Sequence, residues 1–367
     1  MQTATARRPE PTTPAARNWL QRASWTDLFM WTLGGFLILL IVVGSIRSLM
    51  AGRYSAAQWI DFVIFGIAQG SVYSLIALGY TLVYGILRMI NFAHGEVFMI
   101  GAFTTFFLAN ALDDRGFINN NLVLSIILLT LVSAGISMLV AVLLERIAYR
   151  PLRGAPRLVP LITAIGASFF LQYTARGLYG SGNKSYPVIE PLQGKLFFGP
   201  IGILRTQVVV IVSAVILMAA LYTFVQRSKT GKAMRAVAED KEAAALMGVD
   251  VDRTIVITFA IGGALAGAAG ILYGLMFRQV HFFIGFVPGI KAFTAAVLGG
   301  IGNIPGAMLG GLFLGVFESL GPSLFLEGLG IPSANQLKDV IAFTMLVLVL
   351  IFRPTGILGE RLAEKKA

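Results

Sequence analysis

Long apolar segments, separated by short polar ones, follow each other along the chain from residue 28 onward. Most are close to the length of about 20 residues that a helix needs to cross the hydrocarbon core of a bilayer. Nine of them predict membrane-crossing helices, at residues 28–46, 62–84, 97–112, 122–144, 158–174, 206–225, 255–277, 305–320 and 340–352. A tenth, at 284–300, contains Lys291 and several glycines, and it either spans or is re-entrant. The pattern therefore predicts an all-α polytopic membrane protein with about nine to ten transmembrane or re-entrant helices.

The first and last segments are polar and delimit the membrane part. Residues 1–26 are rich in Thr, Pro, Ala and Arg without apolar periodicity, which predicts a disordered basic tail. A cleaved signal peptide is the alternative for 28–46, but that run is longer than the usual 7–15 apolar residues of a signal peptide. The predicted organisation is a tail at 1–26, a helix and outer loop at 27–59, a main membrane domain at 60–353 and a second tail at 354–367.

The composition supports a membrane protein and excludes several kinds of site. Hydrophobic residues make up 56% of the chain and charged residues 13%, against about 25% in soluble domains. Without Cys there is no disulfide or thiolate metal site, and with only two His a histidine metal centre is not expected. We predict no metal and no catalytic residue. The net charge of +11 could indicate nucleic-acid binding, but no basic stripe is interleaved with stacking aromatics.

The basic residues predict how the chain is oriented. With the N-terminus inside, 19 of the 29 Lys and Arg residues fall on the inner side and 10 elsewhere. Because inner loops of membrane proteins carry an excess of Lys and Arg, the N-terminus and the C-terminus are both predicted to be cytoplasmic. The long polar segment 226–254 then also faces the cytoplasm.

Segment 226–254 is too long for a simple turn. Its part AMRAVAEDKEAAALMG is rich in helix formers, and Gly248 is placed to end that helix. We predict a short amphipathic helix on which another protein can dock. The alternative is a solvated connecting helix. The candidate docking residues are Arg235, Glu239, Asp240, Glu242 and Gly248, and Lys241 lies on the same charged side.

The glycine-rich segment 296–315 predicts a broken helix. Gly306 with Gly310, and Gly311 with Gly315, form pairs of small residues suited to close helix packing. The residues expected to break the helix are Gly299, Gly300, Gly302 and Pro305. Broken helices occur at membrane depth where they are buried in protein or line a cavity, so packing and a cavity wall both remain open. A dinucleotide-binding loop is excluded, because Pro305 stands where its last glycine is required.

Three polar residues, Asn91, His94 and Glu96, lie within six positions of RMINFAHGEVFMIGAF at 88–103. On a continuous helix His94 and Glu96 would point about 200° apart, so both can face one ligand only if the chain is broken at Gly95. We predict an unwound segment at 91–95 on a polar route through the membrane, with an interfacial turn as the alternative. Other ionisable residues in or beside the spans are Asp61, Arg88, Lys291, Glu318 and Asp339, and charges at this depth are functional candidates.

The chain has no ATP-binding loop. In the nearest string, QRSKTGKA at 226–233, Gln226 and Ala233 stand where a phosphate-binding loop has Gly and Ser or Thr. If transport by this protein uses ATP, another subunit binds it.

Three long strings resemble one known family. They are GIAQGSVYSLIALGYTLVYGILRMINFAHGEVFMIGAF at 66–103, ERIAYRPLRGAPRLVPLITAIGASFFLQ at 145–172 and AFTAAVLGGIGNIPGAMLGGLFLG at 292–315. Together they resemble the first of the two permease subunits of the high-affinity branched-chain amino acid ABC transporters. The resemblance extends from about residue 60 to RPTGILG at 353–359.

The resemblance implies a transport subunit, not an enzyme, in the bacterial cytoplasmic (inner) membrane. The implied cargo is leucine, isoleucine and valine; related permeases import urea, short amides or other amino acids, and an ion-coupled secondary transporter is a more distant alternative. The implied partners are a second homologous permease or a second copy of this chain, two ABC ATPase subunits that bind ATP and Mg²⁺, and a periplasmic or extracytoplasmic substrate-binding protein. No cofactor is expected in this chain.

The resemblance also bears on particular segments. EAAALMG at 242–248 is similar to part of the pattern with which importer permeases contact their ATPases, although the end of that pattern is missing. The segment around Glu96 is expected near the translocation path, with an ion pair to Arg88 as the structural alternative. The chain departs from the family at 27–59, because members begin near the equivalent of Gln58. This extra helix either packs peripherally or acts as an insertion signal.

Overall fold

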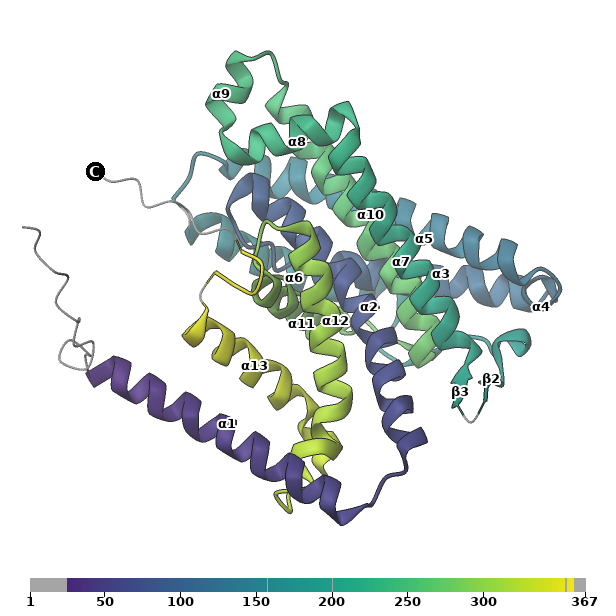
Figure 1. Cartoon of the computed structure of the whole chain (residues 1–367). Helices are drawn as coiled ribbons and strands as arrows, with labels where there is room; N and C mark the ends of the chain where they lie inside the picture. Colours follow the sequence, from purple (N-terminus) through teal and green to yellow (C-terminus); the bar gives the residue numbers. More distant parts are fainter. Residues whose placement is uncertain (1–24, 157, 200, 354, 360–367) are drawn as a thin grey trace, which may run out of the picture.

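The structure is a computed structural model that describes residues 25–359 except 157, 200 and 354, so the predicted tail at 1–26 lies almost wholly outside the described residues. It is a bundle of helices with two short β-ribbons (Figure 1). The α-helices are α1 Trp25–Ala51, α2 Ala56–Leu87, α3 His94–Asp113, α4 Phe117–Asn120, α5 Leu122–Leu144, α6 Leu158–Tyr179, α7 Arg205–Arg227, α8 Lys229–Glu239, α9 Lys241–Leu246, α10 Val251–Phe277, α11 Phe286–Gly299, α12 Ile304–Gly321 and α13 Lys338–Phe352. Two π-helical turns, η2 Glu145–Tyr149 and η5 Pro322–Leu326, extend α5 and α12.

Within the described ranges, nine helices are long and apolar enough to cross a membrane, so the predicted fold class is confirmed. The segment predicted at 284–300 is α11, which has 14 residues and a length of about 21 Å. This is shorter than a bilayer core of about 30 Å, which favours the re-entrant alternative for this segment. Residues 56–59, assigned from the sequence to an outer loop, instead form the first turn of α2.

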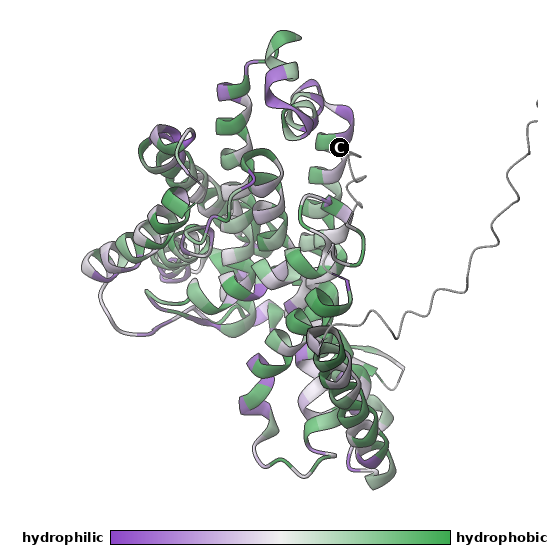
Figure 2. Cartoon of the chain, turned by 90° about the vertical axis from the view of Figure 1, so that its left-hand side faces the viewer, coloured by the Kyte–Doolittle hydropathy of each residue, from purple (hydrophilic) through white to green (hydrophobic). Residues whose placement is uncertain are grey.

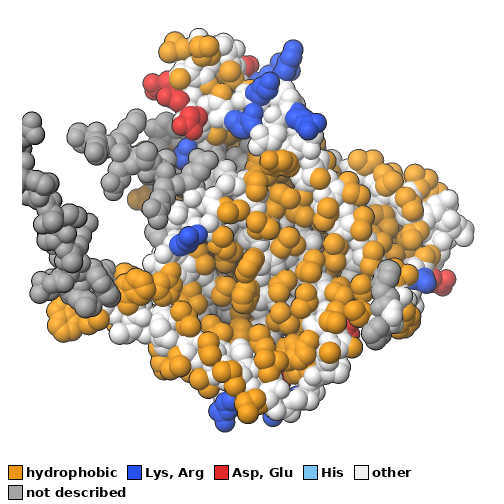
Figure 3. Space-filling view, viewed as in Figure 1, with side chains coloured by type: hydrophobic (Ala, Val, Ile, Leu, Met, Phe, Trp, Pro, Cys, Tyr) orange, Lys and Arg blue, Asp and Glu red, His pale blue; other side chains and the backbone are white. Residues whose placement is uncertain are grey.

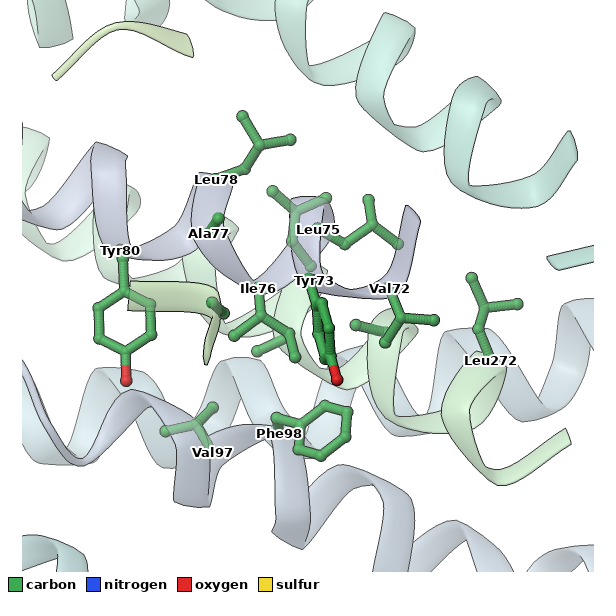
Figure 4. Close-up of a cluster of buried hydrophobic side chains, with 14 of the residues drawn as sticks. Val72, Tyr73, Leu75, Ile76, Ala77, Leu78, Tyr80, Val97, Phe98 and Leu272 are labelled. Carbon is green, nitrogen blue, oxygen red and sulfur yellow. The ribbon is translucent and has the colours of Figure 1, made fainter. Parts of the chain in front are cut away.

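Helix α2 is the central element of the bundle. It packs against α12, α10 and α11, and its residues from Gly66 to Val83 are buried with one exception. Figure 4 shows its side chains interleaved with those of α3 and α10, among them Val97, Phe98 and Leu272. By contrast α1, α5, α6, α7 and α13 expose rows of Leu, Ile, Val and Phe. Figure 3 shows one broad apolar face of the molecule.

The two ends of the bundle differ. Helices α8 and α9 project together from one end, here called the α8–α9 end, and Lys and Arg residues gather there (Figures 1 and 3). Hydrophilic ribbon is also concentrated near this end, whereas the long helices are mostly hydrophobic (Figure 2). The opposite end carries a ribbon of β2 Lys195–Phe198 and β3 Ile201–Leu204, which pair antiparallel with Lys195 opposite Leu204. A smaller ribbon joins β1 Lys184–Ser185 to β4 Gln279–Val280.

Glycines bring α2 and α12 into backbone contact. A Cβ atom added to Gly70 of α2 would lie 2.7 Å from the carbonyl oxygen of Gly311, and one added to Gly66 would lie 2.7 Å from Cα of Val316. Ser74 Oγ crosses the same interface and donates to the Met308 carbonyl at 2.7 Å. Small residues allow this approach, and close packing is what holds helices together inside a membrane.

The opposite side of α12 packs just as closely on α11. Gly306 and Gly310 lie against Gly299 of α11, so α12 presents one pair of glycines to each neighbour. Between the two helices Gly300 and Gly302 have φ of 105° and 97°, a conformation that favours glycine. Asn303 caps the N-terminus of α12 by accepting from the Gly306 amide, and Pro305 lies in its first turn.

Part of the predicted tail at 354–367 is packed. The Ile357 amide donates to the Leu298 carbonyl at 2.8 Å, and the Leu358 amide donates to the Gly299 carbonyl at 3.0 Å. Asn303 Nδ2 donates to the Leu358 carbonyl at 2.9 Å. Residues 355–359 thus complete the hydrogen bonding at the end of α11, where carbonyl groups lack helical partners.

Helix α1 lies at the periphery. It contacts mainly η5, where a Cβ on Gly44 would lie 3.0 Å from Cα of Phe325 and Ser48 Oγ donates to the Ser323 carbonyl at 2.6 Å. Most of its side chains are exposed. Of the two interpretations from the sequence, this placement agrees with peripheral packing.

We expect Gly70→Ala to destabilise the fold, because the added methyl group would overlap the Gly311 carbonyl. Overpacking of this kind typically costs about 1–3 kcal/mol. The matched control is Gly85→Ala on the same helix, since no atom lies within 4 Å of its Cβ position. The measurement is the thermal unfolding midpoint of each purified variant in detergent. Equal midpoints for the two variants would contradict backbone contact at this interface.

Candidate functional site

The connection between α2 and α3 is unwound, but not where the sequence analysis placed the break. Helix α2 ends at Leu87, Arg88 adopts a left-handed conformation with φ of 55°, and α3 begins at His94. The irregular residues are therefore 88–93, and Gly95 belongs to the first turn of α3. Gly95 packs closely on Gly285 and Gly289 at the start of α11, so two helices begin beside each other within the bundle.

Because α3 is continuous through Gly95, it directs its polar residues apart. Asn91 Oδ1 accepts from the Tyr149 hydroxyl at 2.6 Å. The His94 ring lies against Gly79 of α2 and meets Tyr80 edge to face at 4.9 Å. Asn91, His94 and Glu96 are all at least 97% buried, but they do not meet at one point.

Glu96 turns toward α6. Its Oε1 atom accepts from Gln172 Nε2 at 2.7 Å and from Ser168 Oγ at 3.3 Å. Arg88 is not its partner, since the Arg88 guanidinium donates to the Ala238 carbonyl in α8. The alternative of an Arg88–Glu96 pair is therefore wrong.

Glu96 also borders a cavity of about 240 Å³ between α3, α6 and α11, here called the inner cavity. Tyr80, Phe92 and Phe169 supply aromatic walls, and Gly285 and Gly289 leave room beside the carboxylate. Among the described residues, Glu96 Oε2 has no hydrogen-bond partner. This oxygen can accept from a donor that enters the cavity.

A second buried polar cluster joins α11, α12 and α13. Lys291 Nζ lies 2.6 Å from Glu318 Oε1 and 2.6 Å from Asp339 Oδ1, and Gln69 Nε2 of α2 donates to the same Glu318 oxygen at 2.9 Å. The Lys291 and Glu318 side chains are almost fully buried, whereas Asp339 is half exposed. One lysine faces two carboxylates, so with all three ionised the cluster carries one excess negative charge.

The candidate site residues derived from the sequence do not include this cluster. Its three ionisable members are named there only as separate charges in or beside the spans. The available signal was the presence of charge at membrane depth. The sequence gives no sign that Lys291, Glu318 and Asp339 meet, because they lie on three different helices. Gln69 is uncharged and had no distinguishing signal.

At the end opposite α8 and α9, Glu318 and Gln69 border a cavity of about 410 Å³, here called the outer cavity. Phe62 and Phe65 of α2 form part of its wall. Polar groups at a cavity within a mainly apolar bundle mark a place where a polar solute can be held.

The coupling segment 226–254 forms two helices, not the single helix predicted. Asp240 Oδ1 accepts from the amides of Glu242 and Ala243 at 2.9 and 3.0 Å. Asp240 is therefore the N-cap of α9, and this capping separates α9 from α8. Gly248 follows α9 with φ of 84°, in agreement with a helix that ends there.

Helix α9 exposes apolar side chains at its end. Leu246 is 89% exposed and Met247 is 85% exposed, whereas Met234 and Val237 of α8 are buried against the bundle. Arg235 of α8 bonds Gln226, and Glu239 and Glu242 are exposed. The outermost surface of the segment thus combines two large apolar side chains with acidic ones.

No group of three or more His, Asp or Glu residues that could hold a metal ion occurs in the described ranges. The polar clusters above consist of hydrogen-bonding and ion-paired groups. They suit the binding of a polar solute.

Comparison with known proteins gives a consistent set of relatives. A family model described as "Branched-chain amino acid transport system / permease component" matches residues 62–350. The chain is 45% identical to the high-affinity branched-chain amino acid transport system permease protein BraD of Pseudomonas aeruginosa, over 84% of this chain and 98% of that protein. It is 44% and 43% identical to the proteins named LivH of Salmonella typhimurium and Escherichia coli, over 82% of this chain and 95% of each.

We expect Lys291→Met to destabilise the protein strongly, because it leaves the buried Glu318 carboxylate without its cation. Breaking a buried pair in this way typically costs about 3–5 kcal/mol. The double variant Lys291→Met/Glu318→Gln removes both charges and is expected to recover part of the loss. The measurement is the unfolding midpoint of both variants. A double variant no more stable than the single one would show that the pair is not coupled.

Proposed function

The chain belongs to the family of permease components of branched-chain amino acid transport systems, and we propose that it imports leucine, isoleucine and valine as the membrane subunit of a binding-protein-dependent ABC importer. The observation that carries the proposal is the family match over 62–350, together with 45% identity to a permease of this kind over nearly its whole length. The protein is a multi-pass inner-membrane protein. We propose that it is not an enzyme and that ATP and Mg²⁺ bind to separate subunits.

The architecture supports transport in a specific way. Irregular backbone at membrane depth is tolerated where it lines a cavity or is buried in protein. Here the unwound segment 88–93 leads directly into the start of α3, where Gly95 packs on Gly289 of the short helix α11 next to the inner cavity. A bundle with such discontinuities can change shape there without losing long, continuous helices.

Among the three residues proposed on the substrate pathway, we assign direct contact to Glu96 alone. Glu96 borders the inner cavity with a free carboxylate oxygen. Asn91 is held by Tyr149 and His94 packs under Gly79, so both position the start of α3.

The partners we propose follow from the family and from the exposed surfaces. They are a second homologous permease, two ABC ATPases and an extracytoplasmic substrate-binding protein. The excess of Lys and Arg at the α8–α9 end supports a cytoplasmic position for it. We propose that α9 contacts an ATPase through Leu246, Met247 and Glu242, because large exposed apolar side chains among charges are typical of a docking site. ATPase closure would move α8 and α9, and α8 packs on α7, α2 and α10.

The proposal is tested by uptake into proteoliposomes that contain this chain and the proteins that copurify with it. We expect ATP-dependent accumulation of labelled leucine, isoleucine and valine that requires the binding protein, and slower uptake with Glu96→Gln. Uptake of urea or short amides in place of these amino acids would overturn the cargo. Uptake by the chain alone, sustained by an ion gradient, would overturn the ABC mechanism.

We expect Leu246→Asp to reduce uptake at least about tenfold, because it places a charge in an apolar contact with the ATPase. Folding should be unaffected, since Leu246 is 89% exposed. The measurements are leucine uptake and the amount of ATPase that copurifies. The control is Lys229→Glu, a larger change in charge at the first residue of α8. Full uptake with Leu246→Asp would contradict docking through α9.

A further inference from the structure

The outer cavity combines charges of both signs with an apolar wall. The acidic lining residues are Glu318 and Asp61, and the basic ones are Lys195 and Lys338. The apolar lining comes from side chains on α2, β3 and η5, namely Phe62, Phe65, Leu204 and Pro322. At about 410 Å³, the cavity is within the size range of sites that enclose small organic molecules.

Glu318 is the unusual group in this cavity. Its Oε1 atom already accepts from Lys291 and Gln69, whereas its Oε2 atom is buried and has no hydrogen-bond partner among the described residues. A buried acceptor without a donor is costly, and the cost is higher for a charged group. With all three groups ionised, Glu318, Lys291 and Asp339 also carry one excess negative charge. A ligand with a positive charge and N–H donors would compensate the excess negative charge and donate a hydrogen bond to Oε2.

The two lysines provide the complementary charge. Lys195 is in β2 and Lys338 begins α13, and both side chains are exposed. A carboxylate in the cavity would be attracted to them, while an ammonium group would be attracted to Glu318. Charges of both signs at one cavity suit a zwitterion better than a simple cation or anion.

We propose that the outer cavity binds the transported amino acid as a zwitterion. In this arrangement Glu318 Oε2 accepts from the α-ammonium group, Lys338 and Lys195 attract the α-carboxylate, and the aliphatic side chain packs on Phe62 and Phe65. This inference rests on the proposed function and assigns it a first binding site, at the end of the bundle opposite the coupling segment.

The absence of Cys from the chain permits a direct test. Asn335→Cys places a single thiol in the wall of the cavity, whereas Gln336→Cys places one on the adjacent exposed residue, which does not line it. The rate of modification by a charged methanethiosulfonate reagent is measured on the full complex without ATP. We expect millimolar L-leucine to slow modification of the first thiol severalfold and to leave the second unchanged.

The role of each charge is tested with analogues. 4-Methylpentanoate lacks the ammonium group and should not protect Asn335→Cys, and 3-methylbutylamine lacks the carboxylate and should protect it only weakly. Glu318→Gln should raise the leucine concentration needed for protection by roughly tenfold, as expected for loss of a charge-assisted hydrogen bond. Glu327→Gln is the matched control, because Glu327 bonds Tyr54 and lines a different cavity.

A second variant tests the site independently, in case Glu318→Gln does not fold. Lys338 is exposed, so Lys338→Gln should fold normally, weaken protection by leucine and leave protection by 3-methylbutylamine unchanged. Leucine uptake by the wild-type complex without any protection of Asn335→Cys would overturn this site and leave the proposed function intact. Failure of the wild-type complex to import any branched-chain amino acid would overturn both.

Discussion

Backbone contact between α2 and α12 is the constraint on which the rest of the structure depends. Lipid offers helices no hydrophobic reason to associate, so contact at Gly66, Gly70 and Gly311 has to provide close packing directly. The same contact fixes the register of the two helices. Gln69 precedes Gly70, and Glu318 lies one turn beyond Gly315, so the helix pairing also brings these two polar side chains within hydrogen-bond distance. The packing of the fold and the position of its polar cluster therefore have one cause.

The lengths of the apolar segments predict the helices well, because the thickness of the bilayer fixes what a helix must span. The glycines on the two faces of α12 are also evident in the sequence, because each pair is spaced four residues apart. Asp240 shows a limit of this approach: helix propensity predicts one continuous helix, but its side chain caps the backbone and starts another. The cluster of Lys291, Glu318 and Asp339 shows a different limit. Each charge stands out in the sequence, but only the tertiary fold brings the three together. Gln69 is uncharged, so the sequence does not mark it as a member of the cluster.

The two polar cavities differ in what they require of the surrounding helices. Glu96 lies beside the start of α3 and α11, where two helix ends meet and glycines separate the chains. Glu318 lies in a tightly packed region between α2, α11 and α12, held by Lys291 and Gln69. Glu96 is thus surrounded by helix ends, whereas Glu318 is held by side chains from two neighbouring helices.

The segment 355–359 has a consequence for the way the protein is made. Its amides satisfy the carbonyls of Leu298 and Gly299 at the end of α11, yet it follows α13 in the chain. During synthesis on a ribosome, α11 and α12 enter the membrane before the residues that complete them exist. The carbonyl groups at the end of α11 are therefore bound to water or to other groups until α13 has been inserted. The last turn of this short helix is thus among the last parts of the bundle to reach its final form.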